Sequence, residues 1–538
     1  MLRKLALAAC ALAMLALPAN ALAKDGAPQK KVAVIPYIEV DQTVIANLSP
    51  DNDVVTYTRF IAGVDASFKG RNNAGGISLR YEHRFGETAN ASSGDVVSGI
   101  ARVSASVLPY ALTVEAGGLA AQTRIEGNGS AFLNPVIGST GESNVYAAYG
   151  GPSLMTHAGE LDVDGHYFIG YTRLEQPNAV VTSSGPLDLF DDSLSQSAQL
   201  RLGSRPNHLL PAGVGVGGGY FQEDISNLDQ RVRDMSVRGD VTVPISPNVA
   251  LVGGVGYEDV TITSRDALRD GNGYPVIGPD GRYVTDYSAP RHIAYDVTGL
   301  IWDAGVLWRP SRRTSLEAHV GRRYGSMSYY GSLAYHPNSR TSFNVSVYDQ
   351  ITGFGGQVNQ VLQGLPTSFT ANRDAVSGGI GNCVVSLEAG SCMGGVLGAV
   401  RSATFRARGV TASLAFDFGH AQAGIAGGYD RRKFIAAPGT VLASANGLSD
   451  ESYWLAAYLN AKIDQRSSFS TNLYATWFQT GFDLAGNSSG YGASATYSRN
   501  VLPHLDAHAS VSIDGFKSDS LPDDYWSAAA QLGLRYSF

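Results

Sequence analysis

The stretch Gln531-Leu-Gly-Leu-Arg-Tyr-Ser-Phe538 decides the fold class of this chain. Leucine and aromatic side chains alternate with glycine, arginine and serine, which is the two-residue period of a β-strand with one apolar and one polar face. The apolar face needs either lipid or a protein core to cover it. A strand of a soluble core and a strand of a transmembrane barrel are therefore the two interpretations open at this point.

The same stretch favours the membrane interpretation through its pattern polar-x-Gly-x-x-aromatic-x-aromatic. This pattern resembles the signal by which the outer-membrane assembly machinery of Gram-negative bacteria recognises β-barrels for insertion. The positions that carry it are Gln531, Gly533, Tyr536 and Phe538. We therefore expect a barrel in the outer membrane of a Gram-negative bacterium, with the assembly machinery and outer-membrane lipid as partners.

The N-terminal residues predict export. Arg3 and Lys4 precede an apolar run at 5–17, and Ala21-Leu-Ala23 provides the small residues of a cleavage site. A charged start, a run too short to span a bilayer and a small-x-small site together make a secretory signal peptide. We assign residues 1–23 to this signal peptide.

The composition fits an exported protein built from strands. Only 16% of the 538 residues are charged, and the chain holds 63 glycines and 27 tyrosines. Many strands with aromatic girdles and polar turns produce such a composition. No apolar run after residue 23 is long enough for a transmembrane helix. The net charge of −7 gives no reason to expect nucleic acid as a partner.

Two kinds of connection alternate along the chain and predict its topology. Short polar turns lie near 245–248, 309–313, 336–340, 464–467 and 502–504. Long loops rich in Gly, Asn, Asp and Pro span 127–142, 176–192, 264–292, 354–400 and 435–450. Short periplasmic turns and long external loops are the organisation of a transmembrane barrel. We predict an all-β, antiparallel transmembrane barrel of about 22 strands (roughly 20–24) over residues 36–538, after a short periplasmic segment at 24–35.

The three cysteines have different expected fates. Cys10 lies in a stretch that superficially matches a lipoprotein box, but an anchor there would leave an apolar region of about five residues, below the usual length of roughly 7–15. Cys383 and Cys392 remain after export. In an exported protein such a pair predicts a disulfide that staples one loop, whereas a metal site needs more ligands than two thiols.

Three short motifs match catalytic or cofactor patterns, but their surroundings argue against each. Residues 213–218 spell G-x-G-x-x-G inside an alternating strand, with no following helix to cradle a phosphate. Residues 486–490 spell G-x-S-x-G in an expected external loop rather than in a strand-to-helix turn. The Asp/Gly turns within 270–281 lack the ligand spacing of a calcium loop. We therefore assign no catalytic, cofactor-binding or metal-binding residue and expect neither a cofactor nor an enzyme.

Charged residues recur on the strand face opposite the lipid. By this parity we expect the following side chains in the lumen: Arg80, Glu82, Arg84, Arg238, Asp240, Glu317, His319, Arg323, Lys462, Asp464, Asp506, His508, Asp514 and Arg535. Both signs are interspersed, so no ring of one charge selects anions or cations. The main expectation is that they pair across strands and brace a wet interior. A general acid or base among them is the alternative, although spacing singles out no pair.

Arg406 and Arg408 share the parity of lipid-facing residues. A cation at the bilayer midplane costs about 2–4 kcal/mol, so both are expected beyond the apolar band, at the outer rim. Residues 431–433, Arg-Arg-Lys, extend the same patch. The patch predicts contact with lipopolysaccharide phosphates, and a solvated rim is the alternative.

Three stretches resemble a known family. Residues 35–42 (IPYIEVDQ), 302–318 (WDAGVLWRPSRRTSLEA) and 347–354 (VYDQITGF) are similar to outer-membrane β-barrel proteins associated with PEP-CTERM/exosortase and exopolysaccharide systems. Some relatives carry the label of a preprotein translocase subunit, a small single-span inner-membrane protein, whereas this chain shows no such span. The resemblance implies a role in envelope or polysaccharide biology, and it supplies no catalytic residue to carry over.

Two functions follow from these expectations. The first is a channel or export conduit linked to exopolysaccharide or envelope biogenesis, with the loop at 354–400 folding inward to constrict the pore. The alternative is a non-conducting barrel whose external loops bind polysaccharide or a partner. Tyrosines of the loops and rims such as Tyr274, Tyr283 and Tyr287 suit sugar stacking in that case.

Overall fold

The computed structural model describes most of the chain from residue 31 onward. The residues after 30 that it leaves out are 51, 90, 92, 126–129, 133–141, 176–180, 183–184, 187–190, 208–209, 280, 368, 375, 386–390, 393, 483–485 and 520. The predicted signal peptide at 1–23 lies outside the described residues, so that prediction stays open. β1 begins at Lys31, earlier than the expected barrel start at residue 36.

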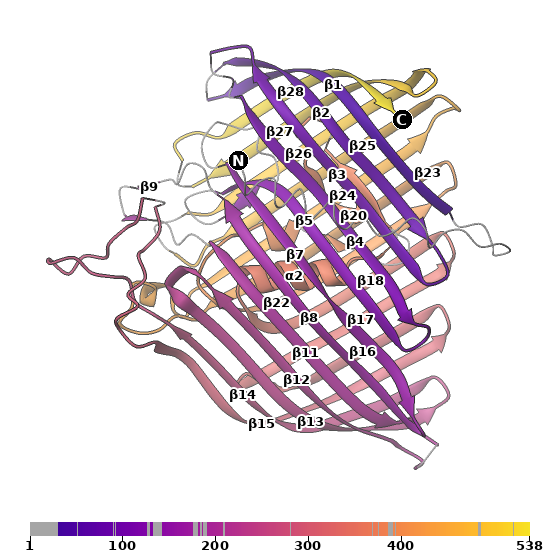
Figure 1. The fold of residues 1–538 in the computed structure, drawn as a ribbon, viewed down its shortest axis with the longest axis vertical. Helices are drawn as coiled ribbons and strands as arrows, with labels where there is room; N and C mark the ends of the chain where they lie inside the picture. The colour runs from indigo at the N-terminus through magenta and orange to yellow at the C-terminus, as the bar shows by residue number, and fades with distance from the viewer. Residues whose placement is uncertain are drawn as a thin grey trace.

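Twenty-two antiparallel strands form a closed ring, which confirms the predicted fold class and strand number (Figure 1). The ring strands are β1 (Lys31–Ser49), β2 (Val54–Lys69), β3 (Asn73–Gly86), β4 (Gly94–Leu108), β5 (Leu112–Ile125), β7 (Glu142–Ala158), β8 (Leu161–Glu175), β11 (Asp192–Ser204), β12 (Gly213–Ile225), β13 (Gln230–Ser246), β14 (Val249–Ser264), β15 (His292–Ser311), β16 (Thr314–Arg323), β17 (Ser326–Asn338), β18 (Thr341–Thr352), β22 (Phe405–Asp417), β23 (Ala421–Phe434), β24 (Ser449–Lys462), β25 (Ser467–Gln479), β26 (Ser488–Leu502), β27 (Leu505–Ser518) and β28 (Tyr525–Ser537).

The ring closes where β1 pairs with β28, the strand of the decisive C-terminal stretch. Because β1 and β28 pair with each other, neither end of the sheet presents an open edge to hydrocarbon, where an unpaired backbone group cannot find water. Along β28, Leu532, Leu534 and Tyr536 are exposed on the outer face, while Gln531 is buried on the inner one. Gly533 also faces inward, because a Cβ there would overlap the carboxylate of Asp41. The alternation read from the sequence therefore separates lipid from lumen.

Connection length sorts by the end of the barrel. One end of the barrel holds the start of β1 and the end of β28. Most turns at this end are two to four residues long, as at 247–248, 339–340 and 503–504. The opposite end carries the long connections, among them 265–291 and 353–404. This arrangement assigns the first end to the periplasm and the second to the exterior. The tip at 324–325, between β16 and β17, is an exception because it is short and external.

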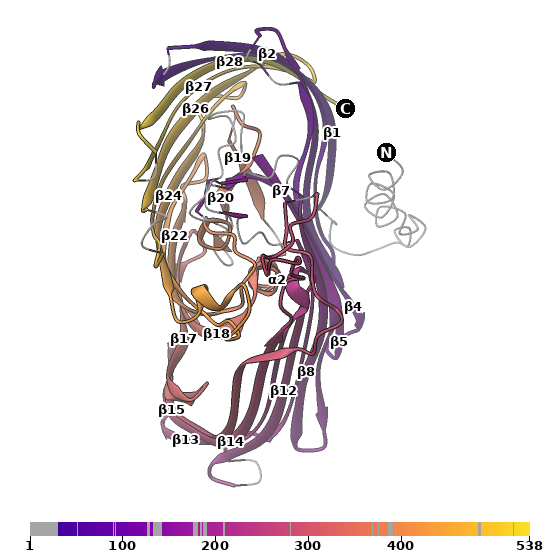
Figure 2. The same ribbon diagram turned by 90° about the vertical axis from the view of Figure 1, so that its left-hand side faces the viewer.

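The connection 353–404, here called the lumen loop, folds into the barrel as the sequence analysis expected (Figure 2). Its elements are α2 (Phe354–Gly364), β19 (Thr370–Arg373), β20 (Ile380–Val385), β21 (Ser391–Cys392) and α3 (Gly394–Leu397). Phe354, Val358 and Leu362 of α2 are fully buried against wall residues that include Leu174 and Ile225. The loop thus has an apolar core of its own against the inner wall.

The remaining elements are short. They are β6 (Ala131–Phe132), β9 (Val181–Thr182), β10 (Gly185–Pro186) and the 3-10 turns η2 (Asn227–Asp229) and η3 (Ala443–Ala445). β6 pairs antiparallel with the last two residues of β5, whereas β9 and β10 pair with each other. Among the described residues, no helix combines the length and apolar character that crossing a membrane requires.

Candidate functional site

A buried carboxylate of the wall fixes the start of the lumen loop. Glu223 of β12 accepts hydrogen bonds from the backbone N–H groups of Gly353 (2.6 Å) and Gly356 (2.8 Å) and from the hydroxyl of Thr352 (3.0 Å). The first N–H groups of a helix lack partners within the helix and carry partial positive charge, so a carboxylate suits this position. One turn further, the Asn359 amide donates to Thr172 Oγ1 (3.1 Å) of β8. The helix α2 is therefore bound to the wall through its N-terminal turns.

Wall arginines bind the rest of the lumen loop through its carbonyl groups. Arg59 donates to Val376 O, and Arg84 donates to Ser377 O at 3.4 Å. Arg432 donates to the carbonyls of Val396 (3.1 Å) and Ala399. Side-chain donors thus satisfy carbonyls of an irregular segment, whose polar groups otherwise cost free energy when buried.

One arginine reaches in the opposite direction, from the loop to the wall. Arg373 of β19 donates to Ser98 Oγ at 2.7 Å and to Ser78 Oγ at 3.1 Å. Burial lowers the pKa of Arg373 to about 10, so its guanidinium keeps its charge at neutral pH. The lumen loop fills one part of the lumen, and the contacts described above lie there. We call this part the filled lobe.

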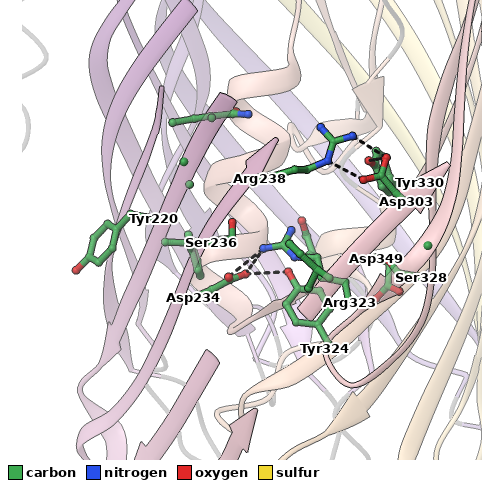
Figure 3. A pocket seen from close by; sticks show the side chains of 18 of the residues that line it. Tyr220, Asp234, Ser236, Arg238, Asp303, Arg323, Tyr324, Ser328, Tyr330 and Asp349 are labelled. Carbon is green, nitrogen blue, oxygen red and sulfur yellow. Dashed lines mark hydrogen bonds and ion pairs between the residues drawn. The ribbon is translucent and has the colours of Figure 1, made fainter. Parts of the chain in front are cut away.

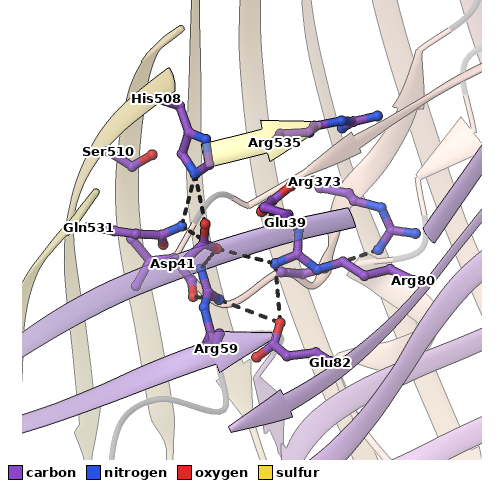
Figure 4. A network of polar contacts seen from close by, with 12 residues as sticks. Glu39, Asp41, Arg59, Arg80, Glu82, Arg373, His508, Ser510, Gln531 and Arg535 are labelled. Atoms are coloured by element: carbon purple, nitrogen blue, oxygen red, sulfur yellow. Dashed lines mark hydrogen bonds and ion pairs between the residues drawn. The ribbon is translucent and has the colours of Figure 1, made fainter. Parts of the chain in front are cut away.

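Four of the expected lumen residues lie in one buried network at the wall of the filled lobe (Figure 4). Asp41 pairs with Arg59 at 2.8 Å and with His508 Nε2 at 3.2 Å, and accepts a hydrogen bond from Gln531 at 2.8 Å. Glu82 pairs with Arg80 at 3.2 Å and with Arg84 at 2.6 Å. The network joins β1, β2, β3, β27 and β28 across the closure of the ring. The expected members are Arg80, Glu82, Arg84 and His508.

Three ligand-type groups in this network lie within 4.8 Å of one another: Glu39, Asp41 and His508. The guanidinium of Arg59 lies 2.8 Å from Asp41, and that of Arg80 lies 3.3 Å from Glu39. These two cations already neutralise the carboxylates and would repel a metal ion at the same place. The cluster fits an ion-pair network rather than a metal centre.

The other expected lumen residues beside β1 and β24–β28 have separate partners. Asp514 accepts a hydrogen bond from the Tyr474 hydroxyl at 3.0 Å. Arg535 pairs with Asp65 at 2.9 Å, and Asp506 accepts a hydrogen bond from Asn500 at 3.1 Å. Lys462 is the exposed last residue of β24. The structure places Asp464 in the turn after β24, outside the wall.

Asp464 accepts a hydrogen bond from the backbone N–H of Arg466 at 2.6 Å, and this bond lowers the pKa of the Asp464 carboxyl. The residue therefore stabilises a periplasmic turn and does not line the lumen. Parity along a strand gives a face only as far as the strand continues. β24 ends at Lys462, two residues earlier.

A cavity of about 470 Å³ lies beside the lumen loop, bounded by β11–β13, by β15–β18, by His166 of β8 and by Gln360 of α2 (Figure 3). We call it the hollow lobe. Arg238 pairs with Asp303 through two hydrogen bonds of 2.7 and 2.8 Å. Arg323 pairs with Asp234 at 2.8 Å. Wall arginines here bind carboxylates of the wall, whereas Arg59, Arg84 and Arg432 bind both wall carboxylates and carbonyls of the lumen loop.

Two further expected residues, Glu317 and His319, lie at the same wall. His319 contacts Asp303 at 2.9 Å and Glu317 at 3.0 Å through its two ring nitrogens. Its ring stacks on that of Tyr330, with centroids 4.6 Å apart and planes 5° from parallel. Asp240 pairs with Arg201 at 2.6 Å. The hollow lobe thus offers paired charges and one stacked aromatic face to its interior.

The basic patch expected at the outer rim includes residues that pair with a carboxylate, and its contact with lipopolysaccharide stays a prediction. Arg406 and Arg408 lie near the external end of β22, but both pair with Asp349 of β18, at 2.6 and 3.1 Å. Arg432 is buried and binds the lumen loop, so its assignment to the patch is wrong. Adjacent strand residues point to opposite faces, and a run of three basic residues cannot share one.

Several residues that build the lumen are not among those predicted from the sequence. Asp234 has the same strand parity as Arg238 and Asp240, so continuing the alternation by two steps from Arg238 toward the N-terminus would have identified it. Strand parity within β12 could have identified Glu223 in the same way. Tyr324 carries none, because it lies in a turn where strand parity ends.

The cysteine side chains lie outside those the structure describes, so the predicted disulfide stays a prediction. The backbone register places Cys383 of β20 directly opposite Cys392 of β21. Directly opposite residues of an antiparallel pair have Cα atoms about 4.5–5.5 Å apart, which falls within the span of roughly 4.4–6.8 Å that a disulfide bridges. The pairing is therefore compatible with a bond.

Comparison with known proteins gives likeness at the level of structure only. No protein-family model matches the chain, and no curated protein does. Similar solved structures include the FrpB iron transporter from Neisseria meningitidis (10% identity, TM-score 0.44, covering 94% of this chain and 82% of that chain). Another is the ferric-catecholate import receptor Fiu from E. coli K12 (10%, 0.41, 93% and 81%). A third is the siderophore receptor PiuA from Acinetobacter baumannii (9%, 0.39, 96% and 82%). At these identities and TM-scores, function has to be inferred from the residues of this chain.

Proposed function

We propose that this protein is an outer-membrane channel whose lumen is constricted by the lumen loop and whose solute path runs through the hollow lobe. The observation that carries the proposal is the cavity of about 470 Å³ between the loop and the wall strands β11–β13 and β15–β18. A barrel of this strand number encloses a lumen wide enough for a channel or a plug. Here the loop occupies one side of the lumen, and the cavity lies on the other.

The chemistry of the cavity wall supports passage of polar solutes. Arg201, Arg238 and Arg323 each pair with an aspartate, so the wall is polar and its charges are locally balanced. Balanced pairs offer hydrogen bonds to a solute without the long-range field of a one-sign ring. The proposal therefore favours neutral or zwitterionic polar solutes over strongly charged ones.

Planar-bilayer conductance tests the proposal directly. Thr352 and Phe405 are opposite residues of the β18–β22 ladder, so a short Gly-Ser linker can replace residues 353–404 without moving either strand. We expect small conductance steps from the full chain and steps several times larger from the linker variant. Shortening the external connection 265–291 is the matched control and should leave the steps unchanged. Two silent proteins, both folded by heat-modifiable gel mobility, would contradict a conducting lumen.

A second candidate function rests on the connection 265–291. Isolated bridges such as Ala267↔Thr285 and Ile277↔Tyr283 make it a narrow projecting arm, and its Tyr274 is 71% exposed. Exposed rings on a supported arm suit stacking on sugar rings, which fits the alternative of a polysaccharide-binding barrel. Saccharide binding that survives replacement of the lumen loop but not removal of the arm would support it. Two further parts of the proposed channel function, an export direction and a link to exopolysaccharide, rest on the resemblance of the sequence to the family named above.

A further inference from the structure

The tip of the β16–β17 hairpin has an unusual backbone. Tyr324 and Gly325 both have positive φ, at 55° and 67°. A two-residue turn of this kind matches the twist of the strands, but it favours Asn-Gly or Gly-Gly because a bulky side chain is disfavoured at positive φ. A tyrosine kept in this position needs contacts that hold it, so its contacts are informative.

Tyr324 fastens the tip to the opposite wall of the hollow lobe. Its hydroxyl donates to Asp234 at 2.9 Å, and its backbone N–H donates to Glu258 at 2.6 Å (Figure 3). Burial raises the pKa of the Tyr324 phenol, so the hydroxyl keeps the proton it donates. The guanidinium groups of Arg323 and Arg406 lie 4.6 and 5.0 Å from the ring centroid. The tip is thus bound to β13 and β14 through side chains.

These contacts close the outer end of the cavity. Tyr324 belongs to a buried apolar cluster with residues at the external ends of β13, β14 and β18, namely Val232, Val260, Ile262 and Ile351. Below this cluster the lining is accessible: Arg323, next to Tyr324, is 35% exposed, and Arg201 of β11 is 38% exposed. The buried cluster therefore covers the outer end of a cavity whose lining is open to solvent.

The tip extends beyond the strand ladders on both sides of its hairpin. The β17–β18 ladder reaches only to Gly331↔Val347, and the β15–β16 ladder only to Trp302↔Arg322. Beyond the first of these limits, side chains span the gap, since Arg408 binds Asp349 and donates to Met327 O at 2.8 Å. Moving the tip would break side-chain contacts and leave the strand ladders intact.

We propose that the Tyr324–Gly325 tip is the outer gate of the channel. In the closed state Tyr324 binds Asp234 and covers the cavity. When the tip swings away from β13 and β14, the hollow lobe becomes continuous with the exterior. This inference rests on the proposed channel function, and it assigns both a direction and a residue to the opening.

A reporter cysteine in the cavity tests the gate. Ser236 lines the cavity below Asp234, and Ser236→Cys is placed in a Cys383→Ser/Cys392→Ser background. A membrane-impermeant maleimide is applied either to intact cells, which gives access from outside, or to outer-membrane fragments, which gives access from both faces. We expect fast labelling in fragments and slow labelling of cells. Adding Tyr324→Ala should raise labelling of cells by about tenfold or more, as loss of the closing contacts shifts the population to the open state.

Matched variants keep the test decisive. Tyr335→Ala, on the same hairpin below the tip, should leave labelling of cells slow. Tyr324→Phe keeps the ring and removes the donor, and should give an intermediate rate even if the alanine variant folds poorly. Equal rates in cells and fragments for the parent, or no increase with either Tyr324 variant, would overturn the gate. Absence of labelling in fragments of folded protein would instead overturn the channel path through the hollow lobe.

Discussion

The filled and hollow lobes use the same kind of wall in two different ways. In the filled lobe, Arg432 binds Asp430 of the wall at 2.9 Å and donates to carbonyls of the lumen loop. In the hollow lobe, Arg238 binds Asp303 and faces the cavity. The side chain of Arg432 is 4% exposed and that of Arg238 is 29% exposed. The difference between the lobes lies in what covers the charges rather than in which residues supply them.

This difference separates stability from permeation. A buried ion pair is costly to break, because removing one partner leaves the other charge uncompensated. An accessible pair contributes little, because water solvates the partner that remains. The filled lobe therefore holds the lumen loop in place, while the hollow lobe can exchange its contacts with a passing solute at little cost.

Arg432→Ala should have the largest effect of the substitutions that probe this contrast. It leaves Asp430 buried without its guanidinium partner and removes donors to the carbonyls of Val396 and Ala399. We expect a loss of about 3–5 kcal/mol in the free energy of unfolding, measured by urea titration in lipid bilayers.

Arg238→Ala is the control in the hollow lobe. Asp303 keeps His319 at 2.9 Å and the Tyr330 hydroxyl at 3.3 Å after the substitution. A loss of about 0–1 kcal/mol is expected there. Equal losses for the two variants would show that the lobes do not differ in the way argued.

Sequence reasoning reached the barrel because alternation is a local property. Each strand reports its own two faces, and turn composition reports its ends, so the ring of 22 strands was predictable. Which residue meets which was not. Glu223 binds Gly353, 130 residues further along the chain, and nothing local to either residue indicates the other.

The same limit applies at the outer rim. Parity gave the face of Arg406 and Arg408, and the cost of a cation at the midplane placed them near the external end, where they lie. Neither argument indicated that the β17–β18 ladder stops at Gly331 and leaves Asp349 to bind them. Solvent or lipid is the default partner for an outward charge when no neighbour is known. The register of strand pairing decides which residue lies beside a given side chain, and that register depends on the whole ring.

The predicted disulfide allows a test of how the lumen loop is held within the filled lobe. Cys383→Ser/Cys392→Ser should weaken the lumen loop by about 2–3 kcal/mol in the chain-entropy account, because the bond closes a loop of roughly ten residues. The effect should stay local, so protease sensitivity of the loop should rise while the unfolding midpoint of the barrel stays constant. Mass spectrometry after alkylation of the denatured, unreduced protein checks the bond itself. Two alkylated thiols in the exported protein would contradict it.

Glu223→Gln tests whether one carboxylate holds the start of the lumen loop. The amide keeps one acceptor, but it brings an NH₂ group toward the N–H groups of Gly353 and Gly356. We expect a loss of about 2 kcal/mol, together with conductance fluctuations as α2 detaches. Asp303→Asn is the matched carboxyl-to-amide change in the hollow lobe and should leave the conductance baseline steady. A steady baseline in the Glu223 variant would show that the apolar contacts of α2 suffice.

Asp240→Asn should have the smallest effect on stability and a visible effect on permeation. Asp240 pairs with Arg201, whose side chain is accessible from the cavity, so water can solvate the arginine that remains. The free energy of unfolding should change by less than about 1 kcal/mol. The hollow lobe gains one net positive charge, and the reversal potential in a salt gradient should shift toward anion preference.

The same charge change in the filled lobe, Asp430→Asn, should lower stability and leave selectivity as it was, because the lumen loop separates it from the solute path. If Asp430→Asn shifts selectivity and Asp240→Asn does not, solutes pass beside the lumen loop rather than through the cavity.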